Sequence, residues 1–223
     1  MNVLITGTSR GIGKGTAEYF LEKGHTIAGF SRTPADITHE NYEHFICDIR
    51  EPDTFPCVEA LPYRCAPDIL INCAGTQNED DIETNLKGTI AVTEKYAFHP
   101  GIFSVLMIGS ASAHTGSEFP EYTASKGGLL SYTKNVALRI AKYGAVCNSL
   151  DFGGVLTKSN SPVTDDPELW KKIMELTPLK RWMTIKEAAE WAYFMTVSNR
   201  FCTGQNILID GLEAGYSRFV WPE

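Results

Sequence analysis

The sequence predicts an α/β fold, a single doubly wound domain with a parallel seven-stranded sheet and helices on both faces. Three observations predict it. Short apolar runs recur along the chain, longer segments with helical periodicity separate them, and a glycine-rich turn follows the first run. Strands and helices in alternation favour right-handed crossovers, which place the strands in one parallel sheet.

Seven apolar runs are the expected strands. They are mostly continuous rather than alternating, as is typical of strands buried on both faces of a parallel sheet. They lie at residues 3–5, 26–30, 44–47, 69–72, 104–108, 145–150 and 206–209.

Amphipathic segments between these runs are the expected helices. The first, 14–23, places Ala17, Phe20 and Leu21 on one stripe and stops at Gly24. The others are 83–98, 123–142, 167–175 and 186–197. We expect one domain over 1–223, with a mobile lid at about 157–182.

Composition excludes several classes of protein. The chain has 223 residues, 43% of them hydrophobic, and a net charge of -7 that argues against a general nucleic-acid binder. Its six cysteines show no zinc-ligand spacing, so we expect no metal and reduced, mostly buried thiols. No apolar run is long enough to span a membrane, and the first residues lack the pattern of a signal peptide. We therefore expect a cytoplasmic protein.

The turn after the first strand has the character of a phosphate-binding loop. It reads Thr6-Gly7-Thr8-Ser9-Arg10-Gly11-Ile12-Gly13 and leads into the first helix. Gly7 permits a tight turn, Gly11 lets the backbone approach a pyrophosphate, and Gly13 lets the helix pack on the strand. The free amides of the helix N-terminus favour phosphate charge. Its place between strand and helix predicts a dinucleotide site.

The spacing Gly-x-x-x-Gly-x-Gly resembles the cofactor motif of the short-chain dehydrogenase/reductase family, including its 3-oxoacyl reductases. The resemblance runs from Met1 to about Gly211, where Asp210-Gly211 matches the family's last strand. It implies a Rossmann-type domain that transfers a hydride between a nicotinamide dinucleotide and a carbonyl or alcohol.

The end of the second strand bears on the choice of cofactor. NAD binders place an acid there for the ribose hydroxyls, whereas this chain has Ser31-Arg32. Arg32 and Arg10 are suited to clamping a 2′-phosphate, because guanidinium matches phosphate geometry. We therefore expect NADP, with NAD less favoured.

The resemblance assigns further cofactor contacts to the ends of later strands. Asp48 would meet the adenine amino group, and Val155 would contact the carboxamide through its backbone. The remaining positions are Ile49, Asn72, Ala74, Gly75 and Thr157. Asn72 has the alternative role of bracing the sheet. Phe152 stands where the family usually has proline.

Tyr122 and Lys126 are the expected proton-transfer pair. A tyrosine has an ordinary pKa of about 10, and a cation four residues along a helix lowers it. Tyr19 and Lys23 have the same spacing, but they lie on the first helix, where packing and surface roles are expected. Tyr122 opens a helix shortly after the fifth strand, where the nicotinamide should lie.

Two further catalytic positions follow from the resemblance. Ser110, after the fifth strand, would hold the substrate oxygen, with Ser112 as a lesser alternative. The interval from Ser110 to Tyr122 is slightly shorter than usual. Asn85, within Thr84-Asn85-Leu86, would hold a water that relays protons to Lys126.

Some neighbouring features have simpler expectations. His114 fits an exposed loop histidine better than a substrate contact, and Asp80 and Asp81 fit solvated acids. The stretch from Gly75 to Asn85 is short for the family, which suggests a more open site.

Two other features point toward a partner subunit. The pair Gly127-Gly128 within a helix suggests close approach by another backbone, and the family often pairs this helix between subunits. The tail from Tyr216 to Trp221 either packs on a neighbour or frays.

The leading hypothesis is an NADP(H)-dependent oxidoreductase that reduces a carbonyl or runs in reverse. Its partners would be a small-molecule substrate and further copies of the chain, as a homodimer or homotetramer, with no nucleic acid and no membrane. The alternatives are an NAD-dependent alcohol dehydrogenase of the same fold and a non-catalytic NADP-binding regulator.

Overall fold

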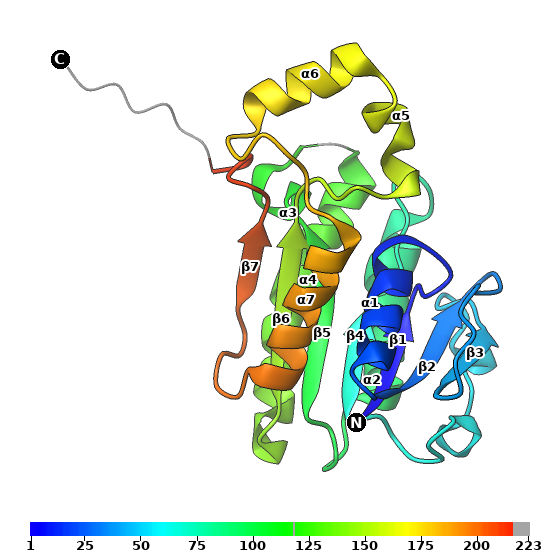
Figure 1. Ribbon diagram of the computed structural model, residues 1–223. Helices are drawn as coiled ribbons and strands as arrows, with labels where there is room; N and C mark the ends of the chain where they lie inside the picture. The colour runs from blue at the N-terminus through cyan, green and yellow to red at the C-terminus, as the bar shows by residue number, and fades with distance from the viewer. Residues whose placement is uncertain (118, 216–223) are drawn as a thin grey trace.

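The computed structural model describes residues 1–117 and 119–215, so the tail expected from Tyr216 to Trp221 lies outside it. Within these residues seven parallel strands form one sheet in the order β3-β2-β1-β4-β5-β6-β7 (Figure 1). The strands are β1 (Asn2–Thr6), β2 (Thr26–Ser31), β3 (Tyr42–Ile46), β4 (Ile69–Asn72), β5 (Ser104–Ser110), β6 (Val146–Phe152) and β7 (Asn206–Ile209). The predicted fold class is confirmed.

The continuous apolar runs form the buried centre of the sheet. β4, β5 and β6 are buried along their whole lengths, because helices cover both faces. β5 pairs with β6 from Ser104 to Ser110, which places Gly109 beside Asp151. β3 is an edge strand, half-buried or exposed along its length.

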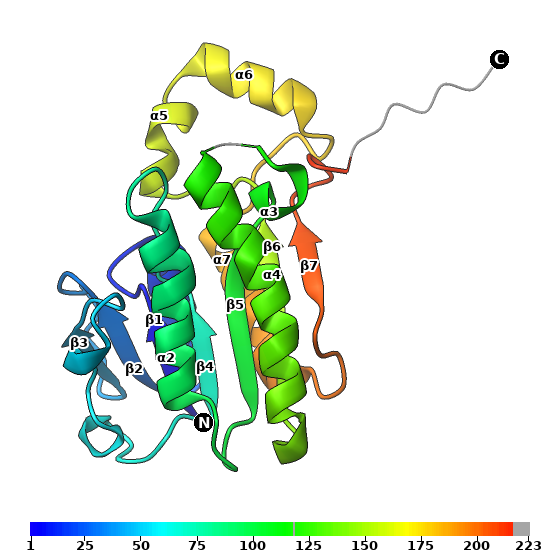
Figure 2. The same ribbon diagram turned by 180° about the vertical axis from the view of Figure 1, so that it is seen from behind.

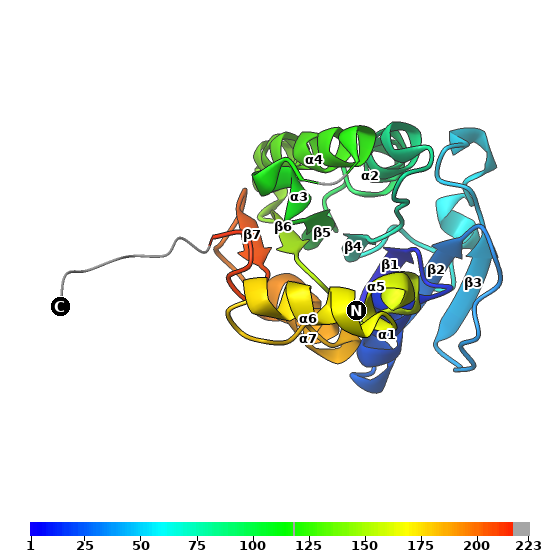
Figure 3. The same ribbon diagram turned by 90° about the horizontal axis from the view of Figure 1, so that it is seen from above.

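Helices cover the sheet in two layers (Figures 2 and 3). Residues from α1 and α7 share one apolar core with Val3, Ile5 and Leu150. Helices α2 and α4 lie over the other face. The helices are α1 (Gly11–Glu22), α2 (Thr89–Tyr96), α3 (Ser112–Thr115), α4 (Pro120–Ile140), α5 (Ser161–Thr164), α6 (Pro167–Leu176) and α7 (Ile185–Tyr193).

The chain also contains π-helical and 3₁₀-helical turns, some of which extend the α-helices. The expected helix 83–98 begins as a π-helix, η3 (Ile82–Gly88), before α2, and α7 continues as a second π-helix, η6 (Phe194–Ser198). Single 3₁₀ turns are η1 (Pro52–Thr54), η2 (Val58–Ala60), η4 (Ala141–Tyr143) and η5 (Lys158–Asn160).

The segment at 157–182 lies above the carboxyl ends of the strands, where α5 and α6 project from the body (Figure 1). Asp166 caps α6 by accepting from the amides of Glu168 and Leu169. Trp170 packs edge-on against Trp182, with ring centroids 5.1 Å apart. Among the residues that the structure describes, none of the helices is long and apolar enough to cross a bilayer.

Candidate active site

A groove at the carboxyl ends of the strands opens at the switch point of the sheet. Strand order reverses there, since β1 lies between β2 and β4, and ligands of doubly wound sheets bind at this point. The groove has a volume of about 570 Å³ and is lined by the loops after β1 to β4, the end of β5, the start of α4 and residues near η5.

The glycine loop lines this groove. Gly7 has a φ of +80°, and a Cβ there would lie 2.9 Å from the backbone of Ala74. A Cβ on Gly13 would overlap the carbonyl oxygen of Gly7, so the first turn of α1 can pack this closely only on glycine. That first turn has neither a side-chain cap nor an acidic residue. Its amides remain available for a phosphate.

Hydrogen bonds hold the loop against its neighbours. The Ser31 hydroxyl accepts from the Ser9 amide at 3.0 Å and donates to the carbonyl oxygen of Phe30 at 2.7 Å. The Thr6 hydroxyl accepts from the amides of Cys73 and Ala74 at 3.0 and 2.9 Å. Thr6, whose role could not be recognised from the motif alone, thus ties the loops after β1 and β4 together.

Fifteen of the residues expected to contact the cofactor line this one groove. They are Gly7, Ser9, Arg10, Gly11, Ile12, Gly13, Ser31, Arg32, Asp48, Ile49, Ala74, Gly75, Tyr122, Lys126 and Thr157. Asn72 does not line the groove: it is buried in the sheet and donates to the Thr93 hydroxyl, which fits its alternative role of bracing the sheet. Val155 is buried beside α7, and its carbonyl oxygen accepts from Asn160.

Tyr122 and Lys126 lie together on the first turns of α4. The Lys126 ammonium lies 5.8 Å from the centre of the Tyr122 ring and donates to the carbonyl oxygen of Ile108 at 2.9 Å. Lys126 is only 7% exposed, and this burial lowers the pKa of its ammonium. Tyr19, with the same sequence spacing, packs edge-on against Tyr193 as expected for a packing residue.

Two serines form a hydrogen-bonded pair at the end of β5. The Ser110 hydroxyl donates to the Ser112 hydroxyl at 3.1 Å and accepts from the Ser112 amide at 3.2 Å. Both side chains are buried, and the groove reaches the adjacent Gly109. Both candidate serines therefore lie at the same corner of the site.

Asn85 is buried in η3, behind the groove. Its side-chain oxygen accepts from the Thr76 amide at 2.8 Å, while its nitrogen donates to the Thr76 carbonyl oxygen and the Ser125 hydroxyl. A Cβ on Gly75 would lie 3.0 Å from the Asn85 oxygen and 3.7 Å from the Lys126 ammonium. Asn85 and Lys126 thus flank Gly75 from two elements.

Two sequence-based expectations need correction: Asp81 is not solvated, and His114, although exposed as expected, lies in α3 and has a buried partner. His114 is not a free loop histidine, because its Nε2 lies 2.6 Å from Oδ2 of Asp151, a residue with 0% exposure. Burial raises the pKa of Asp151, and the hydrogen bond from His114 opposes that rise. Asp81 is also fully buried, whereas Asp80 is exposed and pairs with Arg50. Of these two adjacent acids, only Asp81 points its side chain into the protein.

The cysteines are less buried than expected. Cys47 and Cys147 are buried, two others are half-buried and two are exposed. No disulfide joins them, and no group of acids, histidines and cysteines among the described residues could hold a metal ion.

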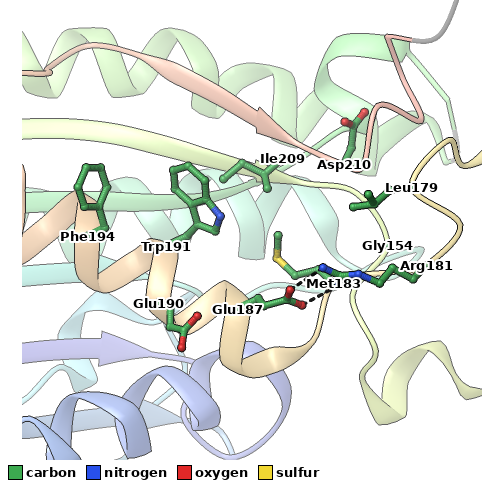
Figure 4. Close-up of a pocket in the computed structure, with 11 residues that line it drawn as sticks. Gly154, Leu179, Arg181, Met183, Glu187, Glu190, Trp191, Phe194, Ile209 and Asp210 are labelled. Atoms are coloured by element: carbon green, nitrogen blue, oxygen red, sulfur yellow. Dashed lines mark hydrogen bonds and ion pairs between the residues drawn. The ribbon is translucent and has the colours of Figure 1, made fainter.

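A second cavity of about 550 Å³ lies between β7, α7 and the segment that leads into α7 (Figure 4). Trp191, Phe194 and Met183 give it an apolar wall, while Arg181 is paired with Glu187 at 2.7 Å. None of its lining residues belongs to the cofactor groove.

A doubly wound sheet with a glycine loop at its switch point defines a dinucleotide-binding domain. The model of a known family, enoyl-(acyl carrier protein) reductase, matches residues 7–216. The chain belongs to the short-chain dehydrogenase/reductase family, whose members are NAD(P)-binding oxidoreductases that act on CH–OH groups.

Individual relatives span almost the whole chain. A 3-oxoacyl-[acyl-carrier-protein] reductase of Buchnera aphidicola is 29% identical over 93% of this chain and 94% of its own length. A glucose 1-dehydrogenase of Gluconobacter oxydans is also 29% identical, over 94% and 90%. The aldohexose dehydrogenase of Thermoplasma acidophilum superposes with a TM-score of 0.83 and 25% identity, over 99% and 96% of the two chains.

Proposed function

We propose that the protein is an NADP(H)-dependent reductase that converts a carbonyl to an alcohol, or the reverse. The observation that carries the proposal is that Tyr122 and Lys126 lie together in the same groove as the glycine loop and two arginines. A regulator that only bound the dinucleotide would need no such pair.

The residues of the groove fit a dinucleotide. Glycines leave space where a Cβ would collide, the first turn of α1 offers free amides, and Arg10 and Arg32 bring positive charge. When bound, the nucleotide supplies or accepts the hydride. The glycine loop would hold the pyrophosphate, and Lys126 would bind ribose hydroxyls.

The remaining chemistry belongs to side chains of the protein. Tyr122 gives its phenolic proton to the developing alkoxide, and Ser110 donates a hydrogen bond to the same oxygen. For this donation the Ser110 hydroxyl turns away from Ser112, which can still donate to Ser110 through its amide. Lys126 favours the phenolate of Tyr122, because a neighbouring cation lowers the pKa of a phenol. Asn85 would hold the water through which a proton returns to Lys126.

NADP is the proposed cofactor because no acid stands at the end of β2. Ser31 turns inward to hold the glycine loop, while Arg32 and Arg10 line the groove and bring positive charge to the expected place of the ribose. Asp48 is held by Arg50, and this contact keeps the pKa of its carboxyl below the ordinary value. An ionised Asp48 suits the adenine amino group.

We propose that the segment 157–182 closes over a small carbonyl substrate, since it lies above the carboxyl ends of the strands and its first residues line the same groove as Tyr122. We also propose a homodimer or homotetramer, because exposed Trp191, Phe194 and Leu138 leave apolar surface on α7, η6 and α4.

The experiment that tests the proposal is oxidation of NADPH and of NADH by the purified protein with a panel of ketones, sugar acids and 3-oxoacyl thioesters. We expect turnover with at least one carbonyl, with kcat/KM higher for NADPH. Replacing both arginines, in Arg10→Ala/Arg32→Ala, should lower kcat/KM for NADPH at least tenfold and leave NADH nearly unchanged. Cofactor binding without turnover on any substrate would instead identify a regulator.

A further inference from the structure

The loop after β4 is tied across the adenosine end of the groove by ion pairs. Arg32, after β2, has Nη2 4.0 Å from Oε2 of Glu79. Arg50, after β3, donates from Nη1 to Oδ2 of Asp80 at 2.6 Å and also holds Asp48. These ion pairs connect the short segment before Asn85 to the ends of β2 and β3.

The loop has a defined shape that fixes where Glu79 stands. Its buried anchor is Asp81, whose carboxylate accepts from the Thr76 hydroxyl and the Asn78 amide, each at 2.8 Å. Asn78 adopts a left-handed conformation with a φ of 60°, and Asn85 holds Thr76 through both backbone groups. The residues around Glu79 are thus fixed from two sides.

Glu79 brings a carboxylate to the place where the 2′-position of the ribose is read. Both Glu79 and Arg32 line the groove, and they are 63% and 46% exposed along their side chains, so either can meet a ligand. A 2′-phosphate would be attracted by Arg32 and repelled by Glu79. A 2′-hydroxyl, in contrast, can donate to a carboxylate, which is how NAD binders use an acid on β2.

We propose that Glu79 is a specificity-determining residue for the cofactor. It competes with a 2′-phosphate for Arg32 and supplies, from the loop after β4, the carboxylate that the end of β2 lacks. The site therefore accepts NADH as well as NADPH, with a smaller preference for NADPH than its arginines alone would give. This inference rests on the proposed function, because it concerns the cofactor of that same site.

The test measures binding rather than turnover. The dissociation constants of NADPH and NADH are determined by fluorescence titration for the wild type, Glu79→Gln and the matched control Glu83→Gln. Glu83 is an exposed acid on the following turn that pairs with Lys87 at 2.6 Å and does not line the groove.

Glu79→Gln should bind NADPH about three- to tenfold more tightly, as expected for removal of one anion beside a phosphate in a partly screened site. NADH binding should stay equal or weaken, and Glu83→Gln should change neither constant more than about twofold. The gain for NADPH should shrink in 0.5 M NaCl, because salt screens exposed charges.

Two results would overturn the inference in distinguishable ways. If both cofactors bind and Glu79→Gln leaves the ratio of their dissociation constants unchanged, Glu79 does not select the cofactor and the proposed function stands. If the wild type binds neither dinucleotide, the proposed function fails, and the role of Glu79 fails with it.

Discussion

Replacing His114 by alanine should destabilise the fold by about 2–3 kcal/mol. Among the described residues, the imidazole is the one hydrogen-bond partner that another element gives to the carboxylate of Asp151, at 2.6 Å, and the other carboxylate oxygen is buried with no hydrogen-bond partner. Removing the partner of a buried acceptor costs about 1–3 kcal/mol, and more where the acceptor is charged. The expected loss stays near the upper end of this range and not beyond it, because the side chain of His114 is 29% exposed and water can partly replace it.

A loss of that size is readily measured. For a domain of this length 1 kcal/mol corresponds to roughly 2–4 °C in the melting temperature, so His114→Ala should melt about 4–12 °C lower. Urea unfolding of His114→Ala, Asp151→Asn and the double variant gives the coupling between the two sites. His39→Ala is the control, because His39 is exposed and bonds only within its own turn.

The double variant gives the sharper result. With Asp151→Asn present, no charge is left buried, so His114→Ala should cost less than half of what it costs alone. A loss below about 0.5 kcal/mol for His114→Ala, or full additivity in the double variant, would refute the idea that Asp151 needs a partner.

Two further predictions concern the helices. Gly127→Ala should raise the free energy of unfolding by up to about 1 kcal/mol, because a Cβ there meets nothing within 4 Å. Gly128→Ala should not raise it, since its Cβ would lie 2.9 Å from Leu86. Urea unfolding of both variants measures the two changes, and an equal increase in stability for both would contradict this packing. Arg181 lowers the pKa of Glu187 to about 2, so the stabilisation by Glu187 should be complete above pH 5 and be lost as the pH falls toward 2. The stability difference between the wild type and Glu187→Gln should therefore shrink between pH 6 and pH 3, and a constant difference would contradict this.

The packing of Gly128 also bears on assembly. Its missing side chain admits Leu86 of the same chain, so this glycine is explained without a partner subunit. Gly127 has open space above it and remains the better marker of a contact between copies.

The fold could be predicted because its signal is local. Each buried strand is a continuous apolar run, and the glycine loop stands directly after β1, so order and motif together give the topology. The effect of Phe152 on the backbone could not be predicted in this way. It stands where the family has proline, yet it simply continues β6 to its last residue, pairing with Ile209 and lying buried.

What could not be predicted depends on contacts between distant segments. Arg32 was expected to be free for a phosphate, because nothing in the sequence shows that Glu79 returns to the same place. The inward turn of Asp81 depends on the left-handed backbone at Asn78. The π-helix η3 escaped prediction because its apolar spacing differs little from that of an α-helix over two turns.

The assignment of Tyr122 as proton donor is decided by the rate of NADPH oxidation in Tyr122→Phe beside the wild type, with NADPH binding measured on the same samples. The variant should bind NADPH with nearly the wild-type affinity and lose turnover by at least about 100-fold, since only the proton donor is removed. Turnover that survives in Tyr122→Phe would contradict the assignment of the proton donor and, with it, the proposed mechanism.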